Sequence, residues 1–256
     1  MRITVKVGTS TLAHATGRLN IQRMEALCKV LSDLKNAGHE IILVSSGAIG
    51  MGVGKLGLRE RPKDIPSKQA AAAVGQCELM YTYDKLFSEY HHTVAQLLIT
   101  GDDTTNDTRR FNFTNTLNRL LELGALPVIN ENDTVATDEI VIGDNDTLAA
   151  IVARSVHADM LILLSDIDGL YTADPHTHPE ATLLHHVAGI DDHIREIAGI
   201  SSSTQGTGGM VTKLHAADIC LGCGCKMVIA NGNNPGNLYD ILEGKTVGTT
   251  FSEERL

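Results

Sequence analysis

The sequence predicts an α/β protein, a three-layer αβα sandwich with a mostly parallel central sheet and helices on both of its faces. Strand-like and helix-like stretches alternate along the chain, which is typical of parallel sheets. The run Met160–Ser165 is nearly all apolar, as expected of a strand buried on both faces. With 256 residues, 43% of them hydrophobic, the chain can bury a large core as one large domain or a bilobal one.

The expected elements follow from local patterns, taken in chain order. Strands are predicted where short apolar or β-branched runs are bounded by turn residues, and helices where apolar residues recur at helical spacing. Gly38 and Gly124 end two of the helices, and Pro66 precedes a third. The expected strands are Ile3–Val7, Glu40–Ser45, Val94–Ile99, Leu126–Asn130, Glu139–Ile142, Met160–Ser165 and Met227–Ala230. The expected helices are Ile21–Ala37, Ser67–Phe87, Thr114–Leu123, Asp146–His157, Val211–Leu221 and Leu238–Leu242, with the loosest stretch at Ile200–Gly209.

Composition excludes several classes of protein. The net charge is −10 and no basic run occurs, which argues against nucleic acid as the main partner. No stretch of about 18 apolar residues occurs and the chain opens directly on a strand, so we expect no membrane association and a cytoplasmic location. The five cysteines are an odd number in a long chain, which favours reduced thiols over a disulfide framework.

Polar and glycine residues follow four of the expected strands where each strand ends. These segments are Lys6–Gly8, Ser45–Gly47, Asn130–Asp133 and Ser165–Asp168. Each alone is explained equally well as a polar cap or turn. Because ligands of open α/β sheets bind beyond the carboxyl ends of the strands, their joint occurrence predicts a binding crevice there.

The residues of this crevice fit phosphoryl transfer. Two lysines lie in glycine-bearing loops, Lys6-Val-Gly-Thr-Ser10 and Gly206-Thr-Gly-Gly-Met-Val-Thr-Lys213. Lys6 and Lys213 supply compact positive charge, and backbone N–H groups near Gly8 and Gly47 add hydrogen-bond donors. Phosphoryl transfer depends on such positioning and charge neutralisation more than on a reactive side chain.

Three other patterns are given a structural interpretation. Gly52-Val-Gly-Lys-Leu-Gly57 matches a dinucleotide-binding pattern, but it does not follow a strand directly, so we expect a glycine-rich loop or a loose helix end. Cys220, Cys223 and Cys225 lack a second ligand pair, which favours small buried thiols near a helix end over a zinc site. The histidines His176, His178, His185 and His186 are expected in a solvated surface loop. No metal ligand is assigned, and no P-loop or protein-kinase motif occurs.

Six ordered stretches resemble the glutamate 5-kinases of the amino-acid kinase superfamily over essentially the whole chain. They are Val5–Ser10, Val44–Ala48, Pro127–Asp133, Val141–Asp146, Gly169–Pro175 and Gly206–Lys213. Two departures stand out. Many members continue into an RNA-binding-like PUA domain, whereas this chain stops shortly after Phe251, and the usual Thr-Asp pair of the nucleotide loop is Ser165-Asp166, which keeps a hydroxyl.

The resemblance implies the amino-acid kinase fold as a single domain over residues 1–256, its N-terminal part binding mainly glutamate and its part from about residue 160 mainly ATP. The implied reaction forms L-glutamyl 5-phosphate from ATP and L-glutamate with Mg²⁺, the first step of proline biosynthesis. Asp146 would orient the two lysines and stay ionised between them. The implied glutamate-binding residues are Ser46, Asp133 and Asn145 with Asn130, and the implied ATP-binding residues are Lys6, Ser165, Asp166, Thr207, Gly208, Gly209, Met210, Val211, Thr212 and Lys213.

Alternatives remain open on the sequence alone. A free α-ammonium group needs an anionic partner such as Asp133 or Asp144, which favours glutamate over the substrate of N-acetylglutamate kinases, whose amine is acetylated; aspartate kinases are a further alternative. A non-catalytic sensor of glutamate or proline is a second alternative, against which Lys6, Asp146 and Lys213 argue. The resemblance further implies inhibition by proline, and we expect a homo-oligomer and a possible partnership with glutamyl-phosphate reductase.

Overall fold

The computed structural model describes residues 1–14, 18–136, 145–175, 177–200 and 209–253. The chain forms two compact units: unit 1 comprises Met1–Lys6 and Asp144–Leu256, and unit 2 comprises Val7–Gly143. The expectation of one domain over residues 1–256 stays a prediction.

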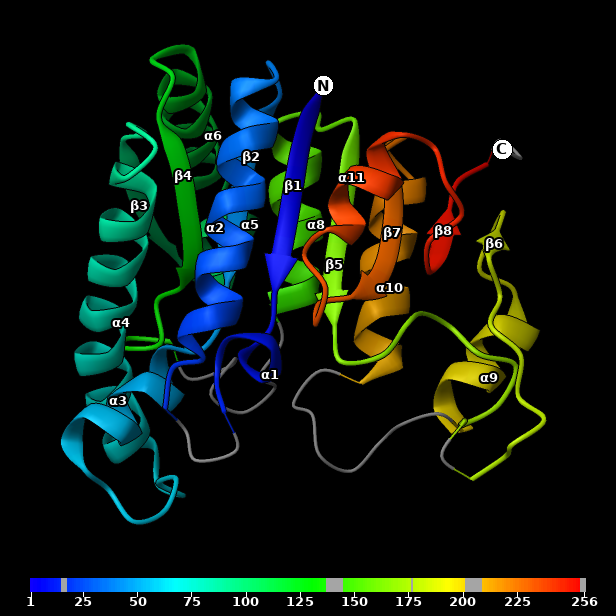
Figure 1. The fold of residues 1–256 in the computed structure, drawn as a ribbon, viewed down its shortest axis with the longest axis horizontal. Helices are drawn as coiled ribbons and strands as arrows, with labels where there is room; N and C mark the ends of the chain where they lie inside the picture. Colours follow the sequence, from blue (N-terminus) through cyan, green and yellow to red (C-terminus); the bar gives the residue numbers. More distant parts are fainter. Residues whose placement is uncertain (15–17, 137–144, 176, 201–208, 254–256) are drawn as a thin grey trace. The chain divides into compact units, whose positions relative to one another are not determined.

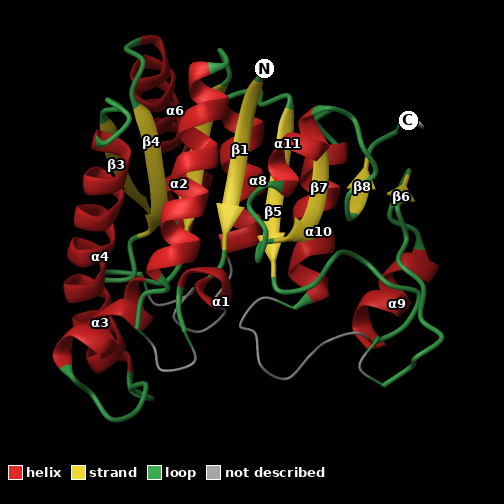
Figure 2. Ribbon diagram, viewed as in Figure 1, coloured by secondary structure: helices red, strands yellow, loops and turns green. Residues whose placement is uncertain are grey.

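Unit 2 is built on a parallel sheet in which the strand β4 is central. The strand order is β3-β4-β2, with Leu98 beside Asn130 and Val44 beside Ile129. Helices α2 and α4 lie on one face of this sheet and α6 on the other (Figures 1 and 2). Its elements are α1 (Thr9–Leu12), α2 (Ile21–Asn36), β2 (Glu40–Ser45), α3 (Ala48–Leu56), α4 (Ile65–Ser88), β3 (Val94–Ile99), α5 (Gly101–Thr105), α6 (Asp107–Glu122) and β4 (Leu126–Glu131).

Unit 1 has a mixed sheet whose strand order is β1-β5-β7-β8-β6. Strands β5 and β7 are parallel, whereas β8 runs antiparallel to β7. Helices α8 and α10 cover one face and α11 the other (Figure 2). Its elements are β1 (Arg2–Val7, whose last residue belongs to unit 2), α8 (Asn145–Ser155), β5 (Met160–Ser165), β6 (His186–Val187), α9 (Asp192–Ile200), α10 (Met210–Leu221), β7 (Lys226–Asn231), α11 (Asn237–Leu242) and β8 (Thr249–Phe251). The mostly parallel α/β class with helices on both faces is confirmed.

Strands that carry the core agree closely with the sequence prediction. All six residues of β5 are buried, as expected for a strand covered on both faces. The predicted bounds of β2, β3 and β5 are those of the structure. The predicted strand at 139–142 lies outside the described residues. Within the part of the chain that is described, no helix is both long enough and apolar enough to cross a membrane.

Two helix starts were predicted wrongly, and α1, α5 and α9 were not predicted at all. Helix α4 begins at Ile65 rather than Ser67, because Asp64 caps it by accepting a hydrogen bond from the Ser67 N–H at 2.9 Å. Pro66 therefore lies inside the first turn, where its missing N–H costs nothing. Helix α6 begins at Asp107, seven residues before the predicted start at Thr114. The prediction missed its first turns because they are largely polar and show no apolar residues at helical spacing.

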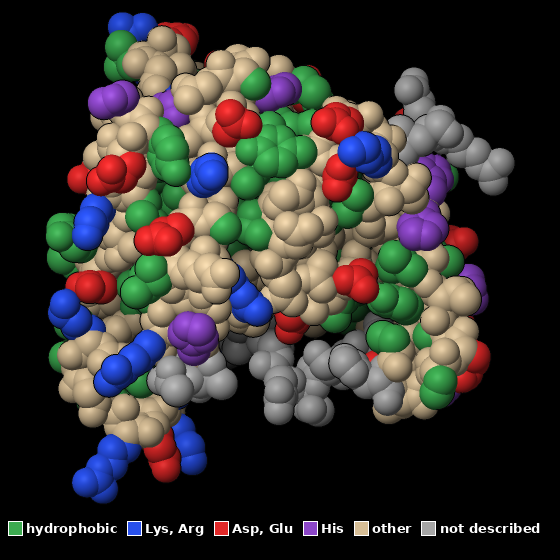
Figure 3. Space-filling view, in the orientation of Figure 1, with side chains coloured by type: hydrophobic (Ala, Val, Ile, Leu, Met, Phe, Trp, Pro, Cys, Tyr) green, Lys and Arg blue, Asp and Glu red, His purple; other side chains and the backbone are tan. Residues whose placement is uncertain are grey.

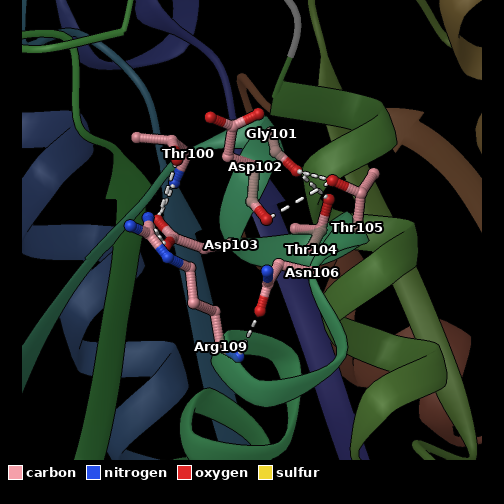
Figure 4. Close-up of polar contacts among 8 residues, drawn as sticks. All are labelled: Thr100, Gly101, Asp102, Asp103, Thr104, Thr105, Asn106 and Arg109. Atoms are coloured by element: carbon pink, nitrogen blue, oxygen red, sulfur yellow. Dashed lines mark hydrogen bonds and ion pairs between the residues drawn. The ribbon is translucent and has the colours of Figure 1, made fainter.

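A polar network orders the turn between β3 and α6 (Figure 4). Thr100 and Asp103 form a capping box at the start of α5, and the Arg109 guanidinium donates to Asp103 at 2.9 Å. Asn106 accepts from the backbone N–H of Arg109 and caps α6. The short helix α5 thus lies between the carboxyl end of β3 and α6, and the sequence analysis missed α5.

The glycine-rich segment Gly52–Gly57 forms the C-terminal half and the end of a helix, so of the two expected forms, a loop or a loose helix end, the structure has a helix end. Helix α3 spans Ala48–Leu56 and ends at Gly57, whose φ of 66° is the left-handed conformation usual for a helix end. The glycines serve packing: a Cβ on Gly52 would lie 1.8 Å from the Ala71 carbonyl oxygen, and one on Gly75 would lie 1.7 Å from that of Ala48. Helices α3 and α4 can pack this closely only without those side chains.

We expect Gly75→Ala to lower the melting temperature markedly. The added methyl group would overlap backbone atoms that cannot turn aside, and forced overpacking costs about 1–3 kcal/mol or more. Gly50→Ala is the matched control on α3, because its Cβ would meet only the Thr9 methyl group at an ordinary 3.5 Å. Thermal unfolding of both variants checks this, and equal melting temperatures would contradict the close helix contact.

The histidine and cysteine clusters differ in how far they match expectation. His185 and His186 are not in a free loop: their rings lie 3.2 and 3.1 Å from the carbonyl oxygens of Gly248 and Ser252, beside β8. Cys220 and Cys225 are buried near the end of α10 as expected, whereas Cys223 is exposed. His176 lies outside the described residues.

Candidate functional site

A buried carboxylate in unit 1 bridges two lysines that are far apart in sequence. The Lys6 Nζ lies 2.6 Å from Asp146 Oδ1, and the Lys213 Nζ donates to Asp146 Oδ2 at 3.0 Å. The Asp146 side chain is 1% exposed, and those of Lys6 and Lys213 are 12% and 8% exposed. Each carboxylate oxygen therefore holds one ammonium group.

Three element ends bring these groups together. Lys6 lies near the carboxyl end of β1, Asp146 in the first turn of α8, and Lys213 in the first turns of α10. Burial by itself raises the pKa of Asp146, but the charges of Lys6 and Lys213 outweigh it and lower the pKa to about 2. Asp146 is therefore ionised at neutral pH, and the trio carries a net charge of about +1.

The first turn of α10 adds donors beside this trio. Gly209 is the N-cap residue of the helix and, having no side chain, does not itself cap the N-terminus. The Thr212 hydroxyl lies 2.8 Å from the Gly209 carbonyl oxygen and 3.2 Å from Asp146 Oδ2. Backbone N–H groups at an uncapped helix N-terminus favour anions such as phosphate. Met210 and Val211 belong to this turn, whereas Thr207 and Gly208 lie outside the described residues.

The carboxyl ends of β5 and β7 lie next to each other in unit 1. Ser165 is paired in register with Asn231, and the Ser165 hydroxyl donates to Asp166 Oδ1 at 3.1 Å. The Asn231 amide donates to Asp168 Oδ1 at 2.8 Å. Ser165 is buried, whereas Asp166 is exposed and open to a ligand.

In unit 2, the turn after β2 presents backbone donors at the start of α3. Gly47 has a φ of 108°, a left-handed conformation that glycine adopts without strain, and it precedes the first helical residue. The Ser46 N–H donates to the Val7 carbonyl oxygen at 3.0 Å, which ties this turn to the residue before Gly8. Gly8 itself precedes α1. Ser46, Gly47 and Gly8 are thus close neighbours within unit 2.

The end of β4 carries the other candidates of unit 2. Asn130 is 2% exposed, and its side-chain Nδ2 donates to the side-chain Oε1 of Gln76 at 2.8 Å. Asp133 follows in a turn that is fastened to β3 by a 2.8 Å hydrogen bond from the Asn132 N–H to the Ile99 carbonyl oxygen. Burial raises the pKa of Asp133 to about 6, and the positive charge of Arg61 lowers it only in part. Asn145, 4% exposed, lies in unit 1 next to Asp146.

The sequence analysis missed Asn231, Gln76 and Arg61. Asn231 directly follows the predicted strand Met227–Ala230, so the rule that ligands bind at strand ends could have found it. Gln76 lies in the middle of α4 and Arg61 in a loop, and neither position carries a sequence signal. In the parts of the chain that are described, no group of three or more His, Cys, Asp or Glu side chains could hold a metal ion.

A sequence model described as the Amino acid kinase family matches residues 1–231. The chain belongs to the amino acid kinase family.

Relatives of this amino acid kinase share about half of its sequence. A glutamate 5-kinase of Clostridium perfringens is 52% identical over 254 residues, covering 98% of this chain and 94% of the relative. One of Caldanaerobacter subterraneus is 53% identical over 251 residues, covering 98% of this chain and 68% of the relative. These similarities assign the amino acid kinase to the glutamate 5-kinase group, as the six motifs indicated.

Solved structures confirm the fold of the family at low sequence identity. A carbamate kinase from Giardia lamblia bound to AMP-PNP has a TM-score of 0.68 and 15% identity, covering 99% of this chain and 98% of that one. A UMP kinase from Bacillus anthracis has a TM-score of 0.64 and 15% identity, with coverages of 99% and 96%. The amino acid kinase fold expected from the sequence is therefore confirmed.

Proposed function

We propose that the chain transfers the γ-phosphoryl group of ATP to the side-chain carboxylate of L-glutamate, the first step of proline biosynthesis. The bridge of Asp146 between Lys6 and Lys213 carries this conclusion. A glutamate carboxylate is already ionised at neutral pH, so the reaction needs no general base. The obstacle is repulsion between two anions, which two fixed ammonium groups reduce.

The two lysines and Asp146 have different roles in this proposal. Lys6 and Lys213 neutralise the transferring phosphoryl group, while Asp146 keeps their ammonium groups in fixed positions. In this proposal the backbone N–H groups near Gly8 and Gly47 add hydrogen-bond donors for the transferring group. The carboxylate of Asp146, with a pKa near 2, is unsuited to accept a proton and is an organiser.

Ligand binding divides between two sets of residues. Ser46, Asn130 and Asp133 bind glutamate together with Asn145, and the Asp133 carboxylate pairs with the α-ammonium group. The nucleotide is bound by Ser165 and Asp166 at the end of β5 and by Thr207–Lys213, including the start of α10. We thus keep, as a proposal, the predicted division of the chain into a part that binds mainly glutamate and a part that binds mainly ATP.

Mg²⁺ accompanies ATP in this proposal. The described residues offer no cluster of acidic or histidine side chains as a protein cage for it. Magnesium commonly binds through nucleotide phosphates with few protein ligands, so it would neutralise phosphate charge as part of the ATP complex. No step of the mechanism above depends on it.

Hydroxylamine trapping of the acyl phosphate tests the proposed function. Purified chain is incubated with ATP, Mg²⁺ and L-glutamate, N-acetyl-L-glutamate or L-aspartate, and hydroxamate is measured for each. We expect product with L-glutamate only. Product with N-acetylglutamate or aspartate instead would reassign the substrate, and glutamate binding without any product would make the chain a sensor.

The pKa of Asp133 predicts how glutamate use depends on pH. Below about pH 6 the carboxyl is protonated and neutral, so it can no longer pair with the α-ammonium group. We expect kcat/KM for glutamate to fall about tenfold per pH unit below pH 6. Asp133→Asn should have a high KM and lose this dependence; an unchanged profile in that variant would remove Asp133 from ammonium recognition.

We further propose that proline inhibits the chain by occupying the glutamate site. Proline, like glutamate, has an α-carboxylate next to a cationic nitrogen, so Asp133 and Asn145 would bind either ligand. Raising glutamate should therefore relieve inhibition, and Asp133→Ala should weaken both ligands together. Initial rates over a grid of the two concentrations measure this. Inhibition that saturating glutamate does not relieve would place proline elsewhere.

The cellular setting is proposed on more general grounds. The five cysteines are all free thiols, in keeping with a reducing cytoplasm. Lys, Arg, Asp and Glu side chains are interspersed on the face that Figure 3 shows, which gives no support for nucleic-acid binding. We propose a homo-oligomer, with glutamyl-phosphate reductase as a partner because an acyl phosphate hydrolyses readily and profits from direct use.

A further inference from the structure

Three polar groups of unit 2 form a chain of hydrogen bonds from the end of β4 to the middle of α4. The Glu131 backbone N–H donates to Asn130 Oδ1 at 2.9 Å, and Asn130 Nδ2 donates to Gln76 Oε1 at 2.8 Å. Asn130 and Gln76 are 2% and 7% exposed and lie 54 positions apart in sequence. Water therefore does not compete for this contact.

The direction of this chain is fixed by its backbone member. Because a backbone N–H can only donate, Asn130 must turn its Oδ1 toward Glu131. Its Nδ2 then faces Gln76, which must present Oε1. The Asn130 amide is thus held at both ends in one of its two orientations.

Stability does not explain why a glutamine occupies position 76. In the described parts of the chain, the buried Gln76 Nε2 has no hydrogen-bond acceptor. A buried donor without a partner loses about as much free energy as one hydrogen bond contributes, so the contact with Asn130 is offset. An apolar side chain of similar length would fill the same space without that loss.

The packing of α4 explains how Gln76 reaches this place. The neighbouring Gly75 lies directly against the Ala48 backbone at the start of α3, two residues after Ser46. Gln76 therefore connects α4, which contacts the start of α3 next to the Ser46 turn, with the Asn130 side chain near the end of β4. Ser46 and Asn130 are both proposed glutamate-binding residues.

We propose that Gln76 is a positioning residue for the amino-acid substrate, acting by holding the Asn130 amide in the orientation that binds glutamate. This inference rests on the proposed function, in which Asn130 contacts glutamate. Gln76 acts through its contact with Asn130.

The decisive variant is Gln76→Met, which keeps side-chain length and removes the acceptor. We expect the KM for glutamate to rise about tenfold while kcat stays within about twofold, because one oriented contact to a charged ligand is lost. The melting temperature should equal or exceed that of the wild type, since the unmet donor is removed as well. Gln69→Met is the matched control: it makes the same change two turns earlier on α4 and should leave the KM unaltered.

Two further variants separate positioning from other roles. Gln76→Glu keeps an acceptor for Asn130 Nδ2, so its KM should lie closer to the wild-type value than that of Gln76→Met. The double variant Gln76→Met with Asn130→Ala should have the KM of Asn130→Ala alone, because Gln76 acts only through Asn130.

Several results would overturn the inference. They are an unchanged glutamate KM in Gln76→Met, additive effects in the double variant, and a Gln76→Met chain that fails to fold or melts well below the wild type. The last would assign Gln76 to stability. The wild type is measured in the same hydroxamate assay, so absence of glutamyl phosphate there would reject the proposed function separately, and glutamate titration calorimetry of wild type and Gln76→Met would still decide the positioning role.

Discussion

Lys213→Ala is expected to lower kcat at least about a hundredfold. Its ammonium group is held at 3.0 Å from Asp146 and is only 8% exposed, so it is fixed before the phosphoryl group carries its transition-state charge. Removing one such fixed donor costs about 3 kcal/mol in the transition state. Lys6→Ala should have an effect of the same order, because Lys6 holds the other oxygen of Asp146. Steady-state rates with saturating ATP and glutamate give the comparison.

The control for this prediction is a lysine of the same unit with surface partners only. Lys245 pairs with Asp240 and Glu243 and is 59% exposed, so Lys245→Ala should keep wild-type turnover. Circular dichroism and thermal unfolding establish that each variant is folded at the assay temperature. Near-normal turnover in folded Lys213→Ala or Lys6→Ala would remove that lysine from the mechanism.

Asp146→Asn is expected to reduce kcat strongly while the glutamate KM stays within a few fold. The amide keeps the shape of the side chain but loses the charge that holds two ammonium groups, so both lysines lose alignment. Asn145→Ala and Asp133→Ala should show the opposite pattern, chiefly a raised KM. If Asp146→Asn changed only the KM, Asp146 would be a binding residue instead.

The stability of Asp146→Asn as a function of pH tests the role of Asp146 independently of activity. The folded-state pKa of Asp146, about 2, lies below its ordinary 3.8, so its ion pairs stabilise the fold above about pH 4, and this contribution is lost as pH falls toward 2. The shift corresponds to about 2 kcal/mol. Asp146→Asn should therefore unfold more readily at neutral pH, because two ammonium groups lose their partner, and this variant's stability should vary less between pH 4 and 2.

The longer strands could be predicted from the sequence because their signal is local, whereas the short strands β6 and β8 were not predicted. Met160–Ser165 is apolar throughout nearly its whole length, and its predicted bounds are those of β5. Helix α3 could not be predicted in this way, since Gly52 and Gly54 weaken helix propensity and the helix exists through its close contact with α4. Its stability comes from a segment that lies elsewhere in the sequence.

Some candidate site residues could likewise be predicted from the sequence, and others could not. The family motifs indicated Lys6, Asp146 and Lys213, and the structure brings these three together although no spacing rule connects them. Gln76 carried no signal, because a single glutamine within a helix is usually a surface residue. Its contact with Asn130 depends on how α4 packs, which only the three-dimensional arrangement reveals.

The bridge at Asp146 also decides when side-chain entropy is lost. A free lysine side chain carries about 2 kcal/mol of rotamer entropy at room temperature, and most of it must be given up to hold an ammonium group in one place. In this chain the shared carboxylate restrains Lys6 and Lys213 as part of folding. The nucleotide therefore meets side chains whose freedom is already gone, and its binding free energy is not spent on ordering them.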